Sequence, residues 1–215
     1  MKPLITTEKI FDMSANTYET TEEQTFQPIH IKTLETSKKF LRRSDDILDY
    51  GCATGTKALE IAGNVHNIQG IDISSKMIEI AKMRANERNI ENVDFAQTTI
   101  FDERYKRESF DVVLAFNILH LLEDNEQVIR RINELLKPSG LFISVTTCLR
   151  EKMTLITKLQ FSLPLFLTQT GLISPLKRFR FPELKDLITN GNFQIIETEK
   201  LFHGMSFYFI AAKKI

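Results

Sequence analysis

Short apolar runs, rich in β-branched residues, alternate along the chain with segments of helical period. This alternation predicts a parallel sheet covered by helices, because parallel strands need crossover connections and those are usually helical. The fourth of the runs is apolar throughout, which is typical of a central strand buried on both faces. The five expected strands are Asp46–Tyr50, Asn67–Ile71, Val93–Gln97, Asp111–Ala115 and Leu141–Thr147.

Two further strands are expected at the carboxyl end, over Phe193–Phe202 and Met205–Lys213. Only a short gap around His203 and Gly204 separates them, so they are expected to pair as an antiparallel hairpin. The predicted sheet therefore has seven strands. The helices predicted between the strands are Thr56–Gly63, Ser74–Asn89, Asn125–Leu136 and Pro182–Asn190.

The remaining segments suggest additions to one compact domain, residues 1–215. A chain of this length with 42% hydrophobic residues buries one sizeable core. Residues 1–45 are expected to form cover helices, over Leu4–Leu41 with a break near Pro28. Residues 149–181 interrupt the strand–helix rhythm with two prolines, a glycine and many apolar side chains. We expect them to form a lid-like, helical insertion.

Charge and cysteine content point to a cytoplasmic protein. Lys+Arg and Asp+Glu both number 28, so no overall charge favours nucleic acid or a membrane as partner. Cys52 and Cys148 are far apart and belong to no metal-ligand pattern, which indicates a reducing compartment and no metal site. The amino-terminal segment is not a signal peptide, and no stretch reaches the roughly 18 apolar residues of a spanning helix.

The loop Gly51-Cys52-Ala53-Thr54-Gly55 follows the first strand and precedes a helix. Small residues allow a ligand to approach the backbone closely, and this loop lies where open α/β sheets bind ligands. A plain strand-to-helix turn is the alternative. The spacing lacks the three glycines of the dinucleotide fingerprint, so a nicotinamide dehydrogenase is the last-ranked function.

Two further positions are predicted to carry chemistry. Asp72 ends the second strand, where a carboxylate can accept hydrogen bonds from ribose hydroxyls; helix capping is the alternative, but Ser74 already has that role. Asn117 and His120 follow the fourth strand, and for both of them local backbone capping competes with a role at the site.

Together these motifs resemble the class I S-adenosylmethionine-dependent methyltransferases, and most closely the small-molecule branch that includes the ubiquinone/menaquinone-biosynthesis methyltransferases. The resemblance covers Asp46–Gly140, weakens over Leu149–Phe181 and returns at Phe181–Lys213. Its parts, in order, are Ile-Leu-Asp-Tyr-Gly-Cys-Ala-Thr-Gly, Gly-Ile-Asp-Ile-Ser-Ser-Lys-Met, Ser-Phe-Asp-Val-Val and Leu-Leu-Lys-Pro-Ser-Gly. It implies a Rossmann-like, mostly parallel sheet with helices on both faces, S-adenosyl-L-methionine as cofactor and S-adenosyl-L-homocysteine as product.

The resemblance also implies residue roles. Ile73 and Met77 would flank the adenine beside Asp72, and Tyr18 matches a tyrosine of the amino-terminal cover helix, with ordinary packing as the alternative. Thr99 and Ile100 stand where the family usually has an acid followed by a small residue, and that acid accepts a hydrogen bond from the adenine amino group. A threonine hydroxyl accepts that hydrogen bond more weakly than a carboxylate does. The other cofactor contacts implied or considered are Asp49, Gly51, Cys52, Ala53, Gly55, Ala115, Phe116 and Asn117.

The expected reaction is methyl transfer to a small, apolar or aromatic acceptor. The sulfonium methyl is already activated, so alignment and exclusion of water are the main tasks. A general base is needed only when the acceptor must lose a proton, and His120 is the best candidate for it. A non-catalytic S-adenosylmethionine-binding module and a protein or RNA methyltransferase remain alternatives; the balanced charge argues against nucleic acid.

The 149–181 segment combines apolar residues with a net positive charge. Glu151 is its only acid. This composition suits a hydrophobic substrate with an anionic group, or peripheral contact with a lipid surface; ordinary packing with a solvated basic face is the alternative. Its basic residues are Arg150, Lys152, Lys158, Lys177, Arg178 and Arg180.

Overall fold

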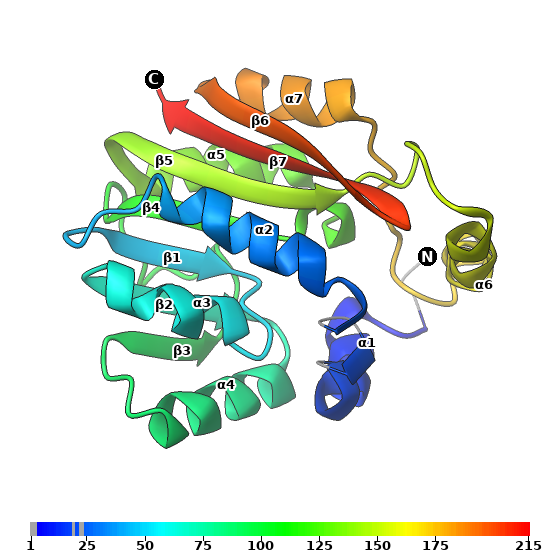
Figure 1. Cartoon of the computed structure of the whole chain (residues 1–215), viewed down its shortest axis with the longest axis horizontal. Coiled ribbons are helices and arrows are strands. Elements are labelled where there is room, and N and C mark those ends of the chain that lie inside the picture. The colour runs from blue at the N-terminus through cyan, green and yellow to red at the C-terminus, as the bar shows by residue number, and fades with distance from the viewer. Residues whose placement is uncertain (1–3, 19, 22–23) are drawn as a thin grey trace.

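A computed structural model describes residues 4–18, 20–21 and 24–215. It contains one seven-stranded sheet in the order β3-β2-β1-β4-β5-β7-β6 (Figure 1). Neighbouring strands from β3 to β5 are parallel, and β7 pairs antiparallel with both β5 and β6. The predicted fold class is therefore confirmed. The strands are β1 (Asp46–Tyr50), β2 (Asn67–Asp72), β3 (Val93–Gln97), β4 (Phe110–Phe116), β5 (Leu136–Thr147), β6 (Phe193–His203) and β7 (Met205–Lys214).

Helices cover both faces of the sheet because successive side chains of each strand point to opposite sides. Ile47 of β1 packs in the core shared with α2, α3 and α4, whereas the next residue, Leu48, packs in the core shared with α5 and α7 (Figure 1). The helices are α1 (Thr7–Ser14), η1 (Ala15–Thr17), α2 (Gln27–Lys38), α3 (Thr56–Ile61), η3 (Ala62–Asn64), α4 (Ser75–Glu87), η4 (Leu119–Leu121), α5 (Asn125–Leu135), α6 (Leu155–Gln169) and α7 (Phe181–Asn190).

The expected break near Pro28 is present: Phe26 is a turn residue, and α2 begins at Gln27 with Pro28 in its first turn, where a residue needs no amide hydrogen of its own. One boundary differs from the prediction. Strand β5 begins at Leu136, five residues earlier than expected. Its pairing with β4 slips between Phe110 and Val112, and Ser139 adopts a positive φ of 63°. Residues 138–140, which lie before the expected strand, are therefore an irregularity within β5.

The amino-terminal segment and the 149–181 segment meet beyond the carboxyl ends of the parallel strands (Figure 1). Ile5 forms a parallel bridge with Ile173, and Met153 forms an antiparallel bridge with Met205. The Thr7 amide also donates to Ser174 Oγ at 3.0 Å. No helix in the described part of the chain combines the length and apolar character needed to cross a membrane.

Candidate active site

Two adjoining cavities open at the carboxyl ends of β1, β2 and β4. The first has a volume of about 170 Å³ and contains Asp72; we call it the Asp72 cavity. The second has a volume of about 340 Å³ and contains His120; we call it the His120 cavity. Their common wall consists of Thr7, Phe11, Tyr18, Asn117 and Leu121.

The loop after β1 lines the Asp72 cavity through backbone in left-handed conformation. Gly51 has a φ of 76° and Ala53 a φ of 48°. The amide of Gly51 donates to the Ile71 carbonyl at 2.8 Å, which holds the loop against β2. A Cβ at Gly51 would lie 2.4 Å from Ile118 Cδ1. Glycine is therefore required at 51 both by the backbone conformation and by the contact with Ile118.

Asp72 ties the two ligand-side loops together. Its Oδ2 accepts a hydrogen bond from the Ala53 amide at 3.1 Å, and its Oδ1 accepts one from the Ser74 amide at 2.9 Å. Burial raises the pKa of this carboxyl, and the backbone hydrogen bonds oppose that shift. A carboxylate has about four lone-pair sites, so two such bonds leave acceptor capacity directed at the cavity.

Asp49 lies beneath the loop and is buried. Burial raises its pKa to about 7, against the opposing effect of Lys57. It is not among the cavity-lining residues, whereas its neighbour Tyr50 is. The remaining predicted cofactor residues that line the Asp72 cavity are Ile73, Phe116 and Asn117.

Several predicted cofactor residues lie outside both linings. Gly55 packs against β3, because a Cβ there would lie 2.6 Å from Phe95 Cζ. The Cys52 side chain points into the core, and burial raises the pKa of its thiol. Thr99 is exposed, and its Oγ1 accepts from the Phe101 amide at 3.3 Å. Fully buried positions outside the linings are Met77, Ile100 and Ala115.

His120 has a buried ring nitrogen in the second cavity. In the described part of the chain, no group hydrogen-bonds its Nδ1. Burial lowers the pKa of the ring to about 4, so the imidazole is neutral at physiological pH. The backbone carbonyl of His120 accepts from the Lys177 amide at 2.8 Å, which joins η4 to the 149–181 segment. A neutral ring presents one donor and one acceptor nitrogen, and no hydrogen bond from a described residue satisfies the buried Nδ1.

Helix α1 contributes to the site although its residues were not predicted to do so: Thr7 and Phe11 line both cavities. The position of α1 is held by Asp12, whose Oδ1 accepts from Ser74 Oγ at 2.6 Å and from the Lys76 amide at 3.3 Å. Thr7 and Phe11 belong to no local motif, so only the tertiary contact reveals the role of the helix. Ile118, next to the predicted Asn117, was missed as well.

We expect Asp12→Ala to weaken binding of S-adenosylhomocysteine about fivefold to tenfold. The substitution removes a charge-assisted hydrogen bond between α1 and α4, with a contribution of about 1–1.5 kcal/mol, and loosens one wall of the Asp72 cavity. Titration calorimetry measures the change. Glu8→Ala, at an exposed position of the same helix, is the matched control; equal affinities of the two variants would contradict the assignment.

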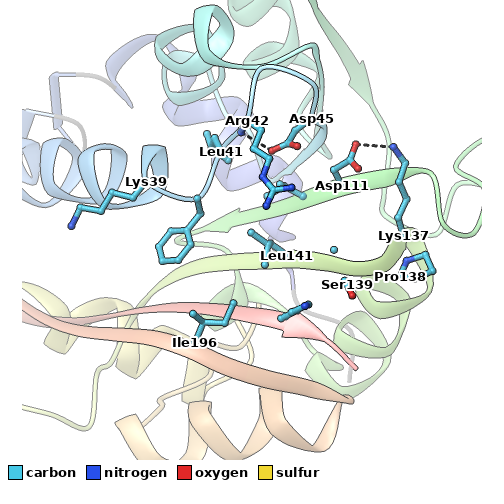
Figure 2. A pocket seen from close by; sticks show the side chains of 14 residues that line it. Lys39, Leu41, Arg42, Asp45, Asp111, Lys137, Pro138, Ser139, Leu141 and Ile196 are labelled. Carbon is cyan, nitrogen blue, oxygen red and sulfur yellow. Dashed lines mark hydrogen bonds and ion pairs between the residues drawn. The ribbon is translucent and has the colours of Figure 1, made fainter.

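A larger hollow of about 500 Å³ lies at the opposite edge of the sheet. Figure 2 shows that both of its carboxylates are paired: Lys137 Nζ contacts Asp111 Oδ2 at 2.7 Å, and Asp45 accepts from the Arg42 amide at 2.8 Å. It borders the amino ends of β1 and β4, whereas open α/β sheets bind ligands at the carboxyl ends. The active site is therefore assigned to the two cavities at the other edge.

The strand order, the loop after β1 and the acid at the end of β2 define the Rossmann-like methyltransferase class of α/β folds. A family model described as "Methyltransferase domain" matches residues 41–178. The chain belongs to this methyltransferase family, and the resemblance predicted from its sequence is confirmed.

Curated relatives match about half of the chain. The "Uncharacterized methyltransferase YcgJ" of Bacillus subtilis is 31% identical over 115 residues, which are 54% of this chain and 44% of that protein. A "Ubiquinone biosynthesis O-methyltransferase" of Salmonella paratyphi A is 32% identical over 95 residues, 44% of this chain and 39% of that protein. The matched segments thus span less than half the length of both relatives.

Solved structures extend the likeness to nearly the whole chain. The "[4+2]-Cyclase SpnF" covers 99% of this chain and 98% of its own, with a TM-score of 0.76 and 19% identity. The N-methyltransferase NodS of Bradyrhizobium japonicum, crystallised with S-adenosylhomocysteine, covers 96% and 97%, with a TM-score of 0.74 and 15% identity. At these identities the likeness concerns the fold, and the different reactions of the cyclase and the N-methyltransferase show that the fold does not specify one reaction.

Proposed function

We propose that this protein transfers a methyl group from S-adenosylmethionine to a small, neutral acceptor with a large apolar surface. The observation that carries the proposal is the shared wall between the Asp72 cavity and the His120 cavity. One cavity offers a carboxylate and exposed backbone for a nucleoside, and the other offers an apolar chamber. The family membership supports the reaction class.

The chain's residues fit the cofactor as follows. Asp72 would accept the ribose hydroxyls, and the loop at Gly51 and Ala53 would allow the methionyl part to approach the backbone. Ile73 would flank the adenine. S-adenosylmethionine supplies an already activated methyl group when bound, so alignment of the acceptor is the protein's main task. The volume of about 170 Å³ is below the roughly 300–1,000 Å³ of ligand sites, so we expect the side chain of Ile118 to move outward on binding.

The lining of the His120 cavity supports a neutral acceptor. Among the described residues, no Asp, Glu, Lys or Arg lines it. The six basic residues of the 149–181 segment, which suggested an anionic substrate group, are all outside this lining. An anionic group here would lose its hydration without a compensating charge, at a cost of several kcal/mol. We propose that residues 149–181 act as a lid and that Tyr18 and His120 orient the acceptor.

The test combines binding with turnover. Calorimetry measures binding of S-adenosylhomocysteine. Mass spectrometry then measures methyl transfer to pairs of phenols that differ only in the presence of a carboxylate. We expect binding, and a kcat/KM at least about tenfold higher for the neutral member of each pair. Absence of binding at millimolar product would overturn the proposal. Methylation of RNA or protein instead of any phenol would favour the corresponding alternative, and binding without any transfer would favour the non-catalytic module.

His120→Gln is expected to reduce the acid sensitivity of folding. The folded pKa of about 4 lies below the unfolded value of about 6.5. The unfolded state therefore binds the proton first, and stability is lost as pH falls from about 6.5 towards 4. Urea denaturation at pH 7 and 4.5 should show an acid-induced loss about 2 kcal/mol smaller in the variant. All other groups titrate in both proteins, so equal losses would contradict the burial of a neutral ring.

The partners and the cellular location of the protein are likewise proposals. We infer a small-molecule substrate and no nucleic-acid partner, from the balanced charge of the chain. We infer a cytoplasmic location from the two free, buried cysteines, since disulfides are rare in reducing compartments.

A further inference from the structure

Helix α6 has two apolar faces that point in different directions. Phe161 and Pro164 on the inner face line the His120 cavity. At 3.6 residues per turn, five other apolar side chains fall within an arc of about 100° on the outer face. That outer face is exposed to solvent: Leu155 is 82%, Leu159 76% and Phe166 58% accessible. The five residues, which we call the outer face, are Leu155, Ile156, Leu159, Leu163 and Phe166.

The segment that carries this outer face is basic, with Arg150 of that segment paired to Glu183. Residues 149–181 contain six of the chain's 28 basic residues and one of its 28 acids. Lys152 and Lys158 flank the first turn of α6, and both are exposed. Lys152 also lies over the ring of Phe202, 5.0 Å from its centroid, which adds a half-exposed aromatic side chain beside the helix. An exposed apolar patch bordered by cations matches the chemistry of an anionic lipid surface.

We propose that α6 docks on anionic membranes through its outer face, with the flanking lysines at the headgroups. Charge complementarity and small area select this occupant over a second copy of the chain. A helix of 15 residues is about 22 Å long and about 10 Å wide, so the face covers roughly 200 Å². A stable protein interface needs about 800 Å² per partner, whereas an interfacial helix needs only its apolar face buried in the bilayer.

The docking also indicates where the acceptor comes from, and this conclusion rests on the proposed function. Because Phe161 and Pro164 line the His120 cavity from the opposite side of the same helix, docking places that cavity about one helix diameter, roughly 10 Å, from the lipid. The acceptor class is then a neutral, lipophilic molecule that partitions into the membrane. Lys177 links the segment to η4 through the His120 carbonyl, so the docked segment and the active site are in direct contact.

The test is cosedimentation of the full chain with vesicles of phosphatidylcholine containing phosphatidylglycerol, and with pure phosphatidylcholine. We expect binding to the anionic vesicles, weakened by salt. The double variant Leu159→Glu/Phe166→Glu should reduce the partition coefficient about tenfold or more, because it removes two inserting side chains. The matched control is Gln160→Glu/Ser162→Glu, which adds the same charge at exposed polar positions of the same helix. Both double variants add the same repulsion from an anionic surface, but the control keeps every inserting side chain, so its loss should be at least about tenfold smaller than that of Leu159→Glu/Phe166→Glu.

Other outcomes contradict either the docking proposal or the proposed function. Absence of vesicle binding, or equal loss in both double variants, would overturn the docking proposal. A dimer by light scattering that only Leu159→Glu/Phe166→Glu dissociates would assign the outer face to a second copy of the chain instead. Calorimetry with S-adenosylhomocysteine on all variants keeps the two proposals separate: we expect unchanged affinity, because no outer-face residue lines either cavity. Vesicle binding without product binding would reject the proposed function alone.

Discussion

Asp72→Asn is expected to weaken binding of S-adenosylhomocysteine about 100-fold or more. Hydrogen bonds to a charged acceptor contribute about 1.5–3 kcal/mol each, and the proposed ribose contact has two. The amide side chain also has only one acceptor oxygen, whereas Asp72 uses both of its oxygens on the amides of Ala53 and Ser74. One loop amide must therefore lose its partner, and the loop itself is destabilised.

Calorimetry gives the affinity, and thermal denaturation separates it from folding. Loss of one backbone contact, about 1–2 kcal/mol, should lower Tm by about 2–6 °C in a chain of this size. Asp94→Asn, at an exposed carboxyl on the adjacent strand β3, should leave both quantities unchanged. An Asp72→Asn protein that keeps wild-type affinity would remove the ribose assignment.

Gly51→Ala is expected to destabilise the fold by about 2–4 kcal/mol and to abolish tight product binding. A residue with a Cβ at a φ of 76° is strained by about 1–2 kcal/mol. The new Cβ would also lie 2.4 Å from Ile118 Cδ1, so the wall of the Asp72 cavity must shift. Denaturant unfolding measures the first effect, and calorimetry measures the second.

Variants at two other glycines separate the two causes of the expected destabilisation, which are backbone strain and the contact with Ile118. Gly171 has a φ of 74°, and a Cβ added there would meet no atom within 4 Å, so Gly171→Ala reports strain alone. Gly63 has open space and no positive φ, so Gly63→Ala should be neutral or slightly stabilising. Adding Ile118→Ala to Gly51→Ala should restore part of the lost stability. If all three single glycine variants behaved alike, the contact with Ile118 would not matter.

The site residues that could be predicted from the sequence were those marked by a pattern in the few residues around them. Asp72 was found because the end of a parallel strand can be located from hydrophobic pattern alone, and carboxyl ends share one edge of the sheet. The same reasoning did not distinguish which side of the loop each residue faces. Gly55 serves the packing of Phe95, and the Cys52 side chain enters the core, because these orientations depend on neighbours from β3 and α4.

The sequence by itself determined the order of strands and helices, the nature of the loop after β1 and the acid that follows β2. These features are local, since each is encoded by a run of a few residues and its turn chemistry. Only the tertiary structure assembles the His120 cavity, which we propose as the acceptor side. The His120 cavity is lined by residues from Thr7 to Met205, so no single stretch carries its pattern. The direction of α6, with one apolar face inward and one in solvent, likewise follows from packing and not from composition, because both faces carry apolar side chains in the sequence.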